Sequence, residues 1–564
     1  MIGVIPKVDQ HAAVEEFFEL FKTPWEFYTV GRRYEVVVAT AEEIPDVDTR
    51  LLVIYGAESK NVDTRHGVAR RSRHRGMSLT YRGSRVPIYD ELLTFEEGGA
   101  GIPCVAVGTE VAGLRVRTAE TVVMRLGYDL FQEVQLLLSV GQPLHNAQIP
   151  TLDMHIMMLR EWILNAGIPL LEIPPAPAGH GFVVCLTHDI DFAGIRHHRF
   201  DHSMWGFLYR STVGAIRNRV RGRISLGQLF RSWRAAASLP LVYAGWAKDF
   251  WEPFDWYLRV EKNLPATYFL IPFKRRPGDH VSAHHGSRRA AAYDITDLPH
   301  WTTTLMREGC ELGVHGIDGW HSTEKGRDEL RRIAAVTRES RIGIRTHWLL
   351  RDENTFRVLE EAGYDYDSSV GYNETIGYRS GTTQVFRPSG ARALLELPLH
   401  IQDGALFYPH RLDLPSSEAW KRCQDLIDHA RQVGGVLTVL WHDRSHAPER
   451  FWGGFYVRLV QALRSLDGWF ATAVQIAGWF RQRRAVRFER LENPDGSART
   501  SLWYHGEKIL PPLTIRVHRP RAAGIDPATL DVPWSGETPL EPDELLRHVS
   551  GSQPSRSGSL GALR

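Results

Sequence analysis

The feature that most constrains the fold is an alternation, over residues 182–482, of short apolar runs with helix-length amphipathic segments. Strands that alternate with helices form parallel βαβ units, and about seven units in roughly 300 residues fit a barrel better than an open sheet. We therefore predict an α/β fold, a distorted (β/α)7-type barrel. The runs are FVVCLT (182–187), ATYFLI (266–271), CELGVH (310–315), YDYDSS (364–369), LLELPL (394–399), VLTVLW (436–441) and WFATAV (469–474).

The rest of the 564-residue chain forms flanking parts. Residues 1–175 mix helical and strand patterns, and we expect an N-terminal α/β domain of unknown role. Three prolines and two glycines in 172–181 indicate a linker, which places the barrel at 178–482. Alternating residues at 485–519 predict a small β unit, and the Ser/Gly/Pro-rich stretch 520–564 predicts a disordered tail.

Composition narrows the class of protein. Because 68 basic side chains nearly balance 66 acidic ones, we expect no nucleic-acid partner. Four cysteines without CxxC spacing predict neither a disulfide framework nor a thiolate zinc site. No apolar run approaches the roughly 20 residues that span a bilayer, and the N-terminus lacks a secretory h-region. We expect a soluble, cytoplasmic protein whose oligomeric state the sequence leaves open.

Metal-ligating residue types follow several of the predicted strands. In (β/α) barrels the chemistry lies at the carboxyl ends of the strands. Four of the apolar runs end in, or are followed at once by, such residues, in THDID, GVHGID, PLHIQD and LWHD. Their shared placement indicates one site more strongly than any single motif does.

The first of these motifs places Asp189 and Asp191 two residues apart at a strand end. One carboxylate can bind a metal ion while the other acts as a base towards water. An Asp-rich turn or helix cap is the alternative interpretation.

Two later motifs supply imidazoles. His315 and His321 lie six residues apart with Asp318 between them, and two His with one Asp form a mixed site of the kind that catalytic zinc uses. A solvated or capping loop His is the alternative. His442 closes a later strand beside Asp443, a carboxylate that could orient it or raise its pKa, as suits a general acid. A structural strand-end His is the alternative here.

In this order the motifs resemble the polysaccharide deacetylase superfamily, carbohydrate esterase family 4 with its NodB-homology domain, and its THDxD-type subset. The resemblance covers about residues 180–482. Further segments are similar in the family's order: LPATYFLIP (264–272) to its second strand, EGCELGVHG (308–316) to the segment entering its His motif, IRTHWLLRDENTFRVLEEAGYDYDSS (344–369) to its arginine motif and the elements that follow, and GGVLTVLWHD (434–443) to its last motif.

The resemblance implies a metal-dependent hydrolase that removes an N-acetyl group from an amino sugar or glycan precursor, with a divalent ion, zinc by preference, as its cofactor. A deformylase or other amidohydrolase with the same site, or a degenerate carbohydrate-binding barrel without activity, are the alternatives. The implied roles are catalytic base for Asp189, metal ligands for Asp191, His315 and His321, general acid for His442, orientation of the base for Arg345, and lining of the substrate groove for Trp348 and Trp441.

This sequence departs from the family pattern in three places. An Ile separates the two Asp residues of the first motif, which are usually adjacent, and the two His lie six rather than four residues apart. The usual spacing would reach Gly319, which has no side chain to bind metal, so Asp318 is the alternative to His321 as third ligand. His347 stands where the arginine motif usually has a proline.

An arginine-rich insertion separates the first two barrel strands. Between Arg196 and Arg234 lie nine arginines and one acid, Asp201, with helical spacing and the exposed-looking aromatics Trp205 and Phe207. A solvated helical excursion or lid is one interpretation. The other is a basic surface that contacts an anionic lipid headgroup or a sugar phosphate.

Overall fold

The computed structural model describes all residues except 97–100, 119, 280–287, 493–497, 521–528 and 542–564. The chain forms two compact units. The first comprises Met1–Gln135, Thr151–Ala178 and Arg481–Arg564, and the second comprises Leu136–Pro150 and Gly179–Phe480. The second unit therefore contains most of the predicted barrel, whereas the strands expected at 485–519 belong to the first.

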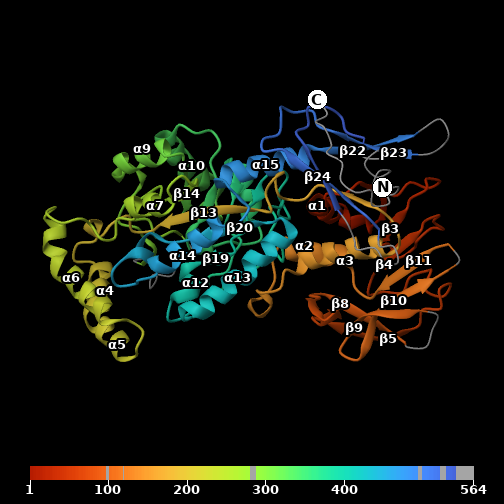
Figure 1. Ribbon diagram of the computed structural model, residues 1–564, viewed down its shortest axis with the longest axis horizontal. Coiled ribbons are helices and arrows are strands. Elements are labelled where there is room, and N and C mark those ends of the chain that lie inside the picture. Colours follow the sequence, from red (N-terminus) through yellow and green to blue (C-terminus); the bar gives the residue numbers. More distant parts are fainter. Residues whose placement is uncertain (97–100, 119, 280–287, 493–497, 521–528, 542–564) are drawn as a thin grey trace, which may run out of the picture. The chain divides into compact units, whose positions relative to one another are not determined.

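A nine-stranded parallel sheet forms the framework of the second unit (Figure 1). Its order is β18-β17-β16-β15-β14-β13-β20-β19, with β21 also paired to β13, and it curls into a half barrel in which no pairing joins the described edge strands β18 and β19. The predicted α/β fold is confirmed, since each of the seven apolar runs overlaps a strand. The strands are β13 (Phe182–Ile190), β14 (Ala266–Leu270), β15 (Glu311–Gly316), β16 (Ile344–Thr346), β17 (Tyr366–Asp367), β18 (Leu395–Glu396), β19 (Ile401–Gln402), β20 (Val436–Leu440) and β21 (Gly468–Phe470).

Helices connect these strands, and their ends follow local sequence rules. The Ser322 side chain accepts a hydrogen bond from the Lys325 N–H at the start of α10, and α13 ends at Gly434, whose φ of 79° is left-handed. The helices are α4 (His202–Tyr209), α5 (Ala215–Val220), α6 (Leu226–Tyr243), α7 (Phe254–Val260), α9 (Pro299–Arg307), α10 (Thr323–Thr337), α11 (Thr355–Ala362), α12 (Asp403–Phe407), α13 (Ser416–Val433), α14 (Gly453–Arg464) and α15 (Ala473–Ala485).

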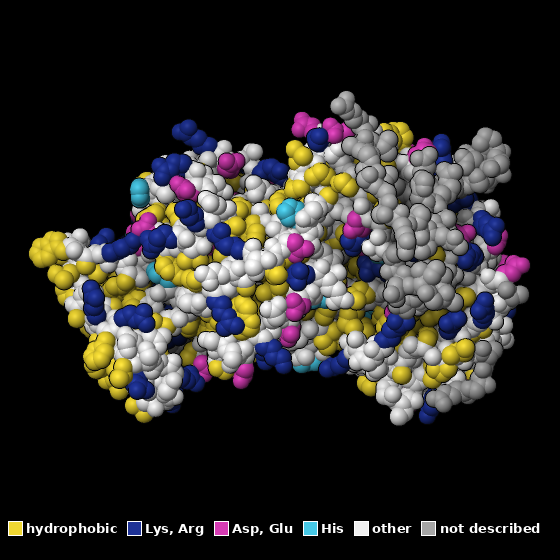
Figure 2. Space-filling model, viewed as in Figure 1, with side chains coloured by type: hydrophobic (Ala, Val, Ile, Leu, Met, Phe, Trp, Pro, Cys, Tyr) yellow, Lys and Arg dark blue, Asp and Glu magenta, His cyan; other side chains and the backbone are white. Residues whose placement is uncertain are grey.

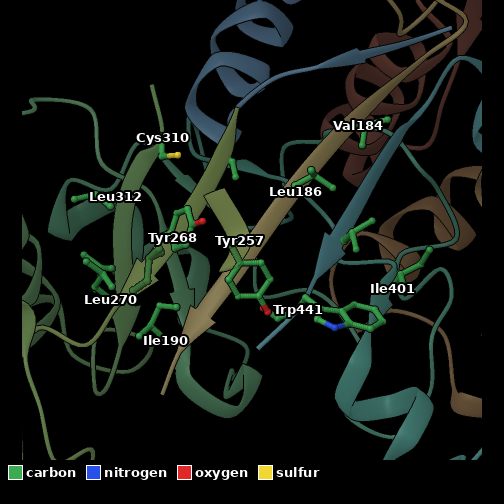
Figure 3. Packing of buried hydrophobic residues seen from close by; sticks show 14 of the residues in the cluster. Val184, Leu186, Ile190, Tyr257, Tyr268, Leu270, Cys310, Leu312, Ile401 and Trp441 are labelled. Atoms are coloured by element: carbon green, nitrogen blue, oxygen red, sulfur yellow. The ribbon is translucent and has the colours of Figure 1, made fainter. Parts of the chain in front are cut away.

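The central strand β13 determines where the polar residues of its motif can point. All nine of its residues are buried, as expected for a parallel strand covered on both faces. Val184, Leu186 and Ile190 pack into the main hydrophobic core with Tyr268 (Figure 3). Because strand side chains alternate, Asp189 lies on the opposite face of the strand.

The first unit contains an eleven-stranded mixed sheet. Its strands are β1 (Ile2–Ile5), β2 (Trp25–Phe27), β3 (Val36–Ala39), β4 (Leu51–Tyr55), β5 (Arg70–Arg75), β6 (Ser78–Tyr81), β7 (Ser84–Pro87), β8 (Glu91–Phe95), β9 (Ile102–Val107), β10 (Glu110–Arg117) and β11 (Val122–Leu126). Its helices are α1 (His11–Phe21) and α3 (Thr151–Asn165), and α2 (Leu130–Leu137) crosses the unit boundary.

The C-terminal strands also belong to the first unit. β24 (Leu513–His518) pairs with β12 (Leu170–Glu172) and with β25 (Thr529–Trp534), while β22 (Arg487–Glu492) pairs with β23 (Ala498–Trp503). The predicted disordered tail at 520–564 thus contains a paired strand, and its segments 521–528 and 542–564 lie outside the described residues.

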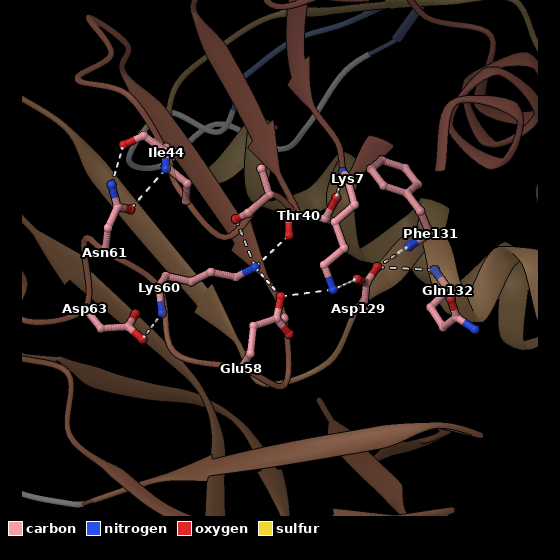
Figure 4. Close-up of polar contacts among 12 residues, drawn as sticks. Lys7, Thr40, Ile44, Glu58, Lys60, Asn61, Asp63, Asp129, Phe131 and Gln132 are labelled. Carbon is pink, nitrogen blue, oxygen red and sulfur yellow. Dashed lines mark hydrogen bonds and ion pairs between the residues drawn. The ribbon is translucent and has the colours of Figure 1, made fainter. Parts of the chain in front are cut away.

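A network of charged side chains lies at the carboxyl ends of the parallel strands β1, β3 and β4 in the first unit (Figure 4). Lys7 Nζ lies 3.0 Å from Glu58 Oε1 and 2.9 Å from Asp129 Oδ2. Lys60 Nζ lies 2.6 Å from the same Glu58 oxygen and donates a hydrogen bond to the Thr40 carbonyl. Each carboxylate of this network is therefore neutralised by a lysine.

None of the helices in the described ranges has both the length and the apolar character that crossing a membrane requires.

Candidate metal centre and active site

Asp189 is held in place by a buried arginine. Arg345, fully buried on β16, places Nη1 3.1 Å from Asp189 Oδ1 and donates from the same nitrogen to Thr187 Oγ1 at 2.7 Å. Its other nitrogens donate to the carbonyl and hydroxyl of Ser368. The guanidinium is thereby fixed, and it orients the carboxylate that sequence analysis assigned as the base.

Asp191 meets two imidazoles. Its Oδ1 lies 3.3 Å from His315 Nε2 and 3.3 Å from His347 Nε2. His315 comes from β15 and His347 follows β16, the next strand in the sheet. Asp189 Oδ2 lies 4.0 Å from His315 Nε2, so both carboxylates of the first motif face the same imidazole.

The tautomer of His315 follows from its second contact. His315 Nδ1 lies 3.0 Å from the carbonyl oxygen of Arg345. A carbonyl only accepts hydrogen bonds, so Nδ1 carries the proton, and in the neutral ring Nε2 is the nitrogen with the lone pair that a metal ion would bind. A histidine that donates one ring N–H to the backbone and offers the other nitrogen is the usual arrangement of a metal ligand.

The cluster of Asp191, His315 and His347 fits a divalent ion. Its three ligand atoms lie within 4.8 Å of one another, and in the described part of the chain the buried Asp191 Oδ1 has no hydrogen-bond partner. Tetrahedral zinc with bonds of about 2.0–2.1 Å separates its ligand atoms by about 3.3–3.4 Å. The two 3.3 Å distances from Asp191 therefore suit a shared ion.

Electrostatics agree with this donor set. Burial acts to raise the pKa of Asp191, but the imidazoles of His315 and His347 beside it lower it below its usual range. Burial lowers the pKa of His347 well below its ordinary value. An ionised carboxylate and neutral imidazoles are the protonation states that bind metal.

His321, the predicted third ligand, is not in this cluster. The loop after β15 turns at Asp318, whose carbonyl accepts the His321 N–H, and Glu329 of α10 anchors the loop by accepting the N–H groups of Ile317 and Asp318. His321 Nε2 instead lies 3.2 Å from Asp318 Oδ1. The alternative ligand, Asp318, is therefore also outside the cluster, and His347 stands where His321 was expected.

His321, Asp318 and Asp279 form a second group of possible ligands, within 4.8 Å of one another. Lys325 pairs with both carboxylates of this group, at 3.3 Å for Asp318. Its ammonium already supplies the positive charge that a metal ion would bring, so this group resembles an ion-pair cluster rather than a metal centre.

His442, the predicted general acid, is oriented by a carboxylate that sequence analysis did not assign. Its Nδ1 lies 2.5 Å from Asp403 Oδ1, and its backbone N–H donates to Asp403 Oδ2 at 2.9 Å. Burial acts to lower the pKa of His442, but the charge and hydrogen bond of Asp403 raise it to about 10. His442 is therefore protonated at neutral pH.

The neighbour that sequence analysis offered for this role, Asp443, points elsewhere. Its Oδ2 accepts hydrogen bonds from the N–H groups of Phe192 and Ala193, at 2.7 and 2.9 Å. Asp443 thus holds the loop that follows β13. Asp403 ends the PLHIQD segment, so a signal for it was present in the sequence.

A cavity of about 460 Å³ adjoins the metal cluster. Trp348 lines it with Asp191, His347, Tyr408 and Arg444. Trp348 has a φ of 68°, a left-handed conformation that is rare for a bulky residue and is typical of functional sites.

Trp441 does not line a groove, contrary to prediction. It is fully buried in the core of the second unit (Figure 3). Its ring stacks on that of Phe455, with centroids 5.8 Å apart and planes 3° apart. Trp441 directly follows β20 and lies in the same hydrophobic core as Phe455 and Tyr456 of α14.

No family model and no curated protein matches the chain. Similar solved structures include a protein of Mycobacterium smegmatis assigned as a polysaccharide deacetylase (TM-score 0.32, 18% identity, covering 55% of this chain and 95% of that one), one of Pseudomonas aeruginosa PAO1 with the same assignment (0.33, 15%, 55% and 94%), and PuuE allantoinase (0.34, 14%, 54% and 92%). Polysaccharide deacetylases, which the motifs resemble, are thus among the structures similar to this chain.

Proposed function

We propose that the chain is a metal-dependent hydrolase of the polysaccharide deacetylase superfamily that removes an N-acetyl group from an amino sugar or glycan precursor. The observation that carries the proposal is the meeting of Asp191, His315 and His347 beside the Arg345-bound Asp189. A ligand set with an adjacent oriented carboxylate is what amide hydrolysis by a metal site requires.

The ligands would be Asp191, His315 and His347, with His347 replacing the His321 of the sequence prediction. A divalent ion, zinc by preference, would act there as a Lewis acid towards the acyl oxygen and make water more acidic. His315 is preset for binding because its Nδ1 proton is engaged by the Arg345 carbonyl.

The remaining steps belong to the side chains of the chain itself. Asp189, oriented by Arg345, accepts a proton from the attacking water. His442, kept protonated by Asp403, donates a proton to the departing amine nitrogen, so that the sugar leaves as a neutral amine. Trp348 offers an aromatic face beside the ligands for the apolar face of a sugar ring.

The test is product analysis with purified protein and N-acetylated chito-oligosaccharides. We expect acetate release that stops after chelation and returns on addition of zinc. Release of formate from an N-formylated sugar without acetate from the N-acetylated one would reject deacetylation while keeping the site. No turnover of either substrate by protein shown to carry metal would reject the proposed function.

A further inference from the structure

The arginine-rich insertion between β13 and β14 exposes an unusual amount of apolar surface. It contains α4, the π-helical turn Arg210–Gly214, α5 and α6. Of the nineteen large apolar side chains that the described part of the chain exposes, eleven lie in the insertion and the segments flanking it: Phe200, Trp205, Tyr209, Val213, Ile216, Val220, Leu226, Phe230, Trp233, Leu241 and Trp246.

These side chains follow helical spacing. Trp205, Tyr209 and Val213 recur every four residues along α4 and the π-helical turn, and Leu226, Phe230 and Trp233 recur at intervals of four and three along α6. Residues so spaced share one face of a helix. The exposed fractions are large, 61% for Phe230 and 83% for Trp246.

The exposed stripe is not the face by which the insertion packs on its own unit. That face carries Phe207, Leu239 and Val242, which are buried against Trp251 and Ala447. The exposed-looking Phe207 of the sequence analysis is therefore a core residue. Helices α4 and α6 thus each have two apolar faces, and monomeric proteins rarely leave a second one in contact with water unless it binds something.

Positive charge surrounds this stripe. Arg217, Arg221 and Arg234 are exposed, and neither they nor Arg219 pair with any carboxylate of the described residues. Figure 2 shows the yellow apolar side chains gathered with dark blue basic ones at the end of the second unit where α4, α5 and α6 lie. Asp201 is the one acid between Arg196 and Arg234.

We propose that this face, defined by the eleven exposed apolar residues and the four unpaired arginines, docks on the surface of an anionic lipid bilayer. Helices that carry Trp, Phe and Leu beside arginines insert their apolar side chains at the headgroup boundary while the arginines meet anionic headgroups. A second copy of the chain is a poorer occupant, because a symmetric interface would oppose two arginine-rich faces.

Docking would bring the candidate active site close to the lipid surface. His202 and Ser203 lie in the first turn of α4 and line the same cavity as Asp191. The proposal does not depend on the proposed function, since lipid binding is measured without turnover.

The experiment is sedimentation of the full chain with vesicles of phosphatidylcholine alone or mixed with phosphatidylglycerol. We expect binding to the mixed vesicles only, weakened at high salt because ions screen the arginines. The double variant Arg217→Glu/Arg221→Glu should weaken binding about tenfold or more, whereas Arg217→Lys/Arg221→Lys should retain it. Phe230→Ser/Trp246→Ser should also weaken it, since apolar burial is lost.

Matched control variants are available on other surfaces. Val30 is 82% exposed in the first unit, and Arg331 is an exposed arginine of α10, so Val30→Ser and Arg331→Glu should bind like the wild type. Thermal unfolding of each variant checks that it folds. Equal binding to both vesicle types, no vesicle binding, or patch variants that bind like the wild type would overturn the proposal. So would a dimer that the Phe230→Ser/Trp246→Ser variant dissociates in the absence of any vesicle binding.

Discussion

Both units place polar residues at the carboxyl ends of parallel strands, but the carboxylates there have different neighbours in the two units. In the first unit, Glu58 lies between Lys7 and Lys60, so each negative charge has a fixed positive partner (Figure 4). In the second, the buried Asp191 oxygen faces, among the residues that the structure describes, the imidazoles of His315 and His347 and no lysine or arginine within ion-pair distance. Placement at a strand end does not by itself make a metal site. A ligand set is distinguished by buried acceptor atoms whose charge no side-chain ammonium or guanidinium neutralises.

The largest expected difference between the two units is in turnover. Asp189→Asn removes the proposed base but leaves the proposed ligands Asp191, His315 and His347 in place. We therefore expect the rate of acetate release to fall about 10³-fold or more with the metal content unchanged. Glu58→Gln removes a carboxylate in the same kind of position in the first unit and should leave the rate unchanged. Acetate release and metal analysis of both variants test this pair, and wild-type rates in Asp189→Asn would reject the assignment.

The pH dependence should reveal the Asp403–His442 pair. Because Asp403 raises the pKa of His442 to about 10, the acid is protonated below that pH, and activity should be lost only as the pH rises through it. In Asp403→Asn the pKa should return towards its ordinary value, which moves the alkaline limb of the rate profile to lower pH. Asp443→Asn is the matched control, and an equal displacement of the limb in that variant would contradict the pairing.

The smallest expected effect is on stability. Burial acts to raise the pKa of Glu58, but Lys60 and Lys7 lower it below its ordinary value. Its contribution to folding is therefore present above that ordinary value and is lost as the pH falls through the lowered pKa. We expect Glu58→Gln to lower the free energy of unfolding by about 1–2 kcal/mol. Denaturant titration at neutral pH measures this, and a stabilised variant would contradict the described pairing.

The sequence predicted the fold well because apolar runs and their spacing are local signals. The burial of all nine β13 residues agrees with the apolar run FVVCLT (182–187), which the sequence shows directly. Asp189, Asp191 and His315 could also be predicted as site residues from the sequence. Each lies in or next to a strand, and the alternation of side chains along the strand fixes the face of the sheet on which it lies.

The third ligand that we propose was harder to predict, because its position depends on loop conformation and strand order. His321 follows a turn whose N–H groups donate to Glu329, a residue of the next helix, α10. His347 is an unusual residue in the arginine motif, but the sequence alone does not show that the strand before it, β16, pairs with β15. Trp441 looked like a groove residue by position, yet it packs against Phe455.

The most direct test of the account compares the metal content of His347→Ala and His321→Ala, each purified in zinc-containing medium and measured by plasma mass spectrometry. If Asp191, His315 and His347 form the metal centre, His321→Ala will retain stoichiometric metal and His347→Ala will lose it. Retention of metal by His347→Ala together with its loss from His321→Ala would contradict the account.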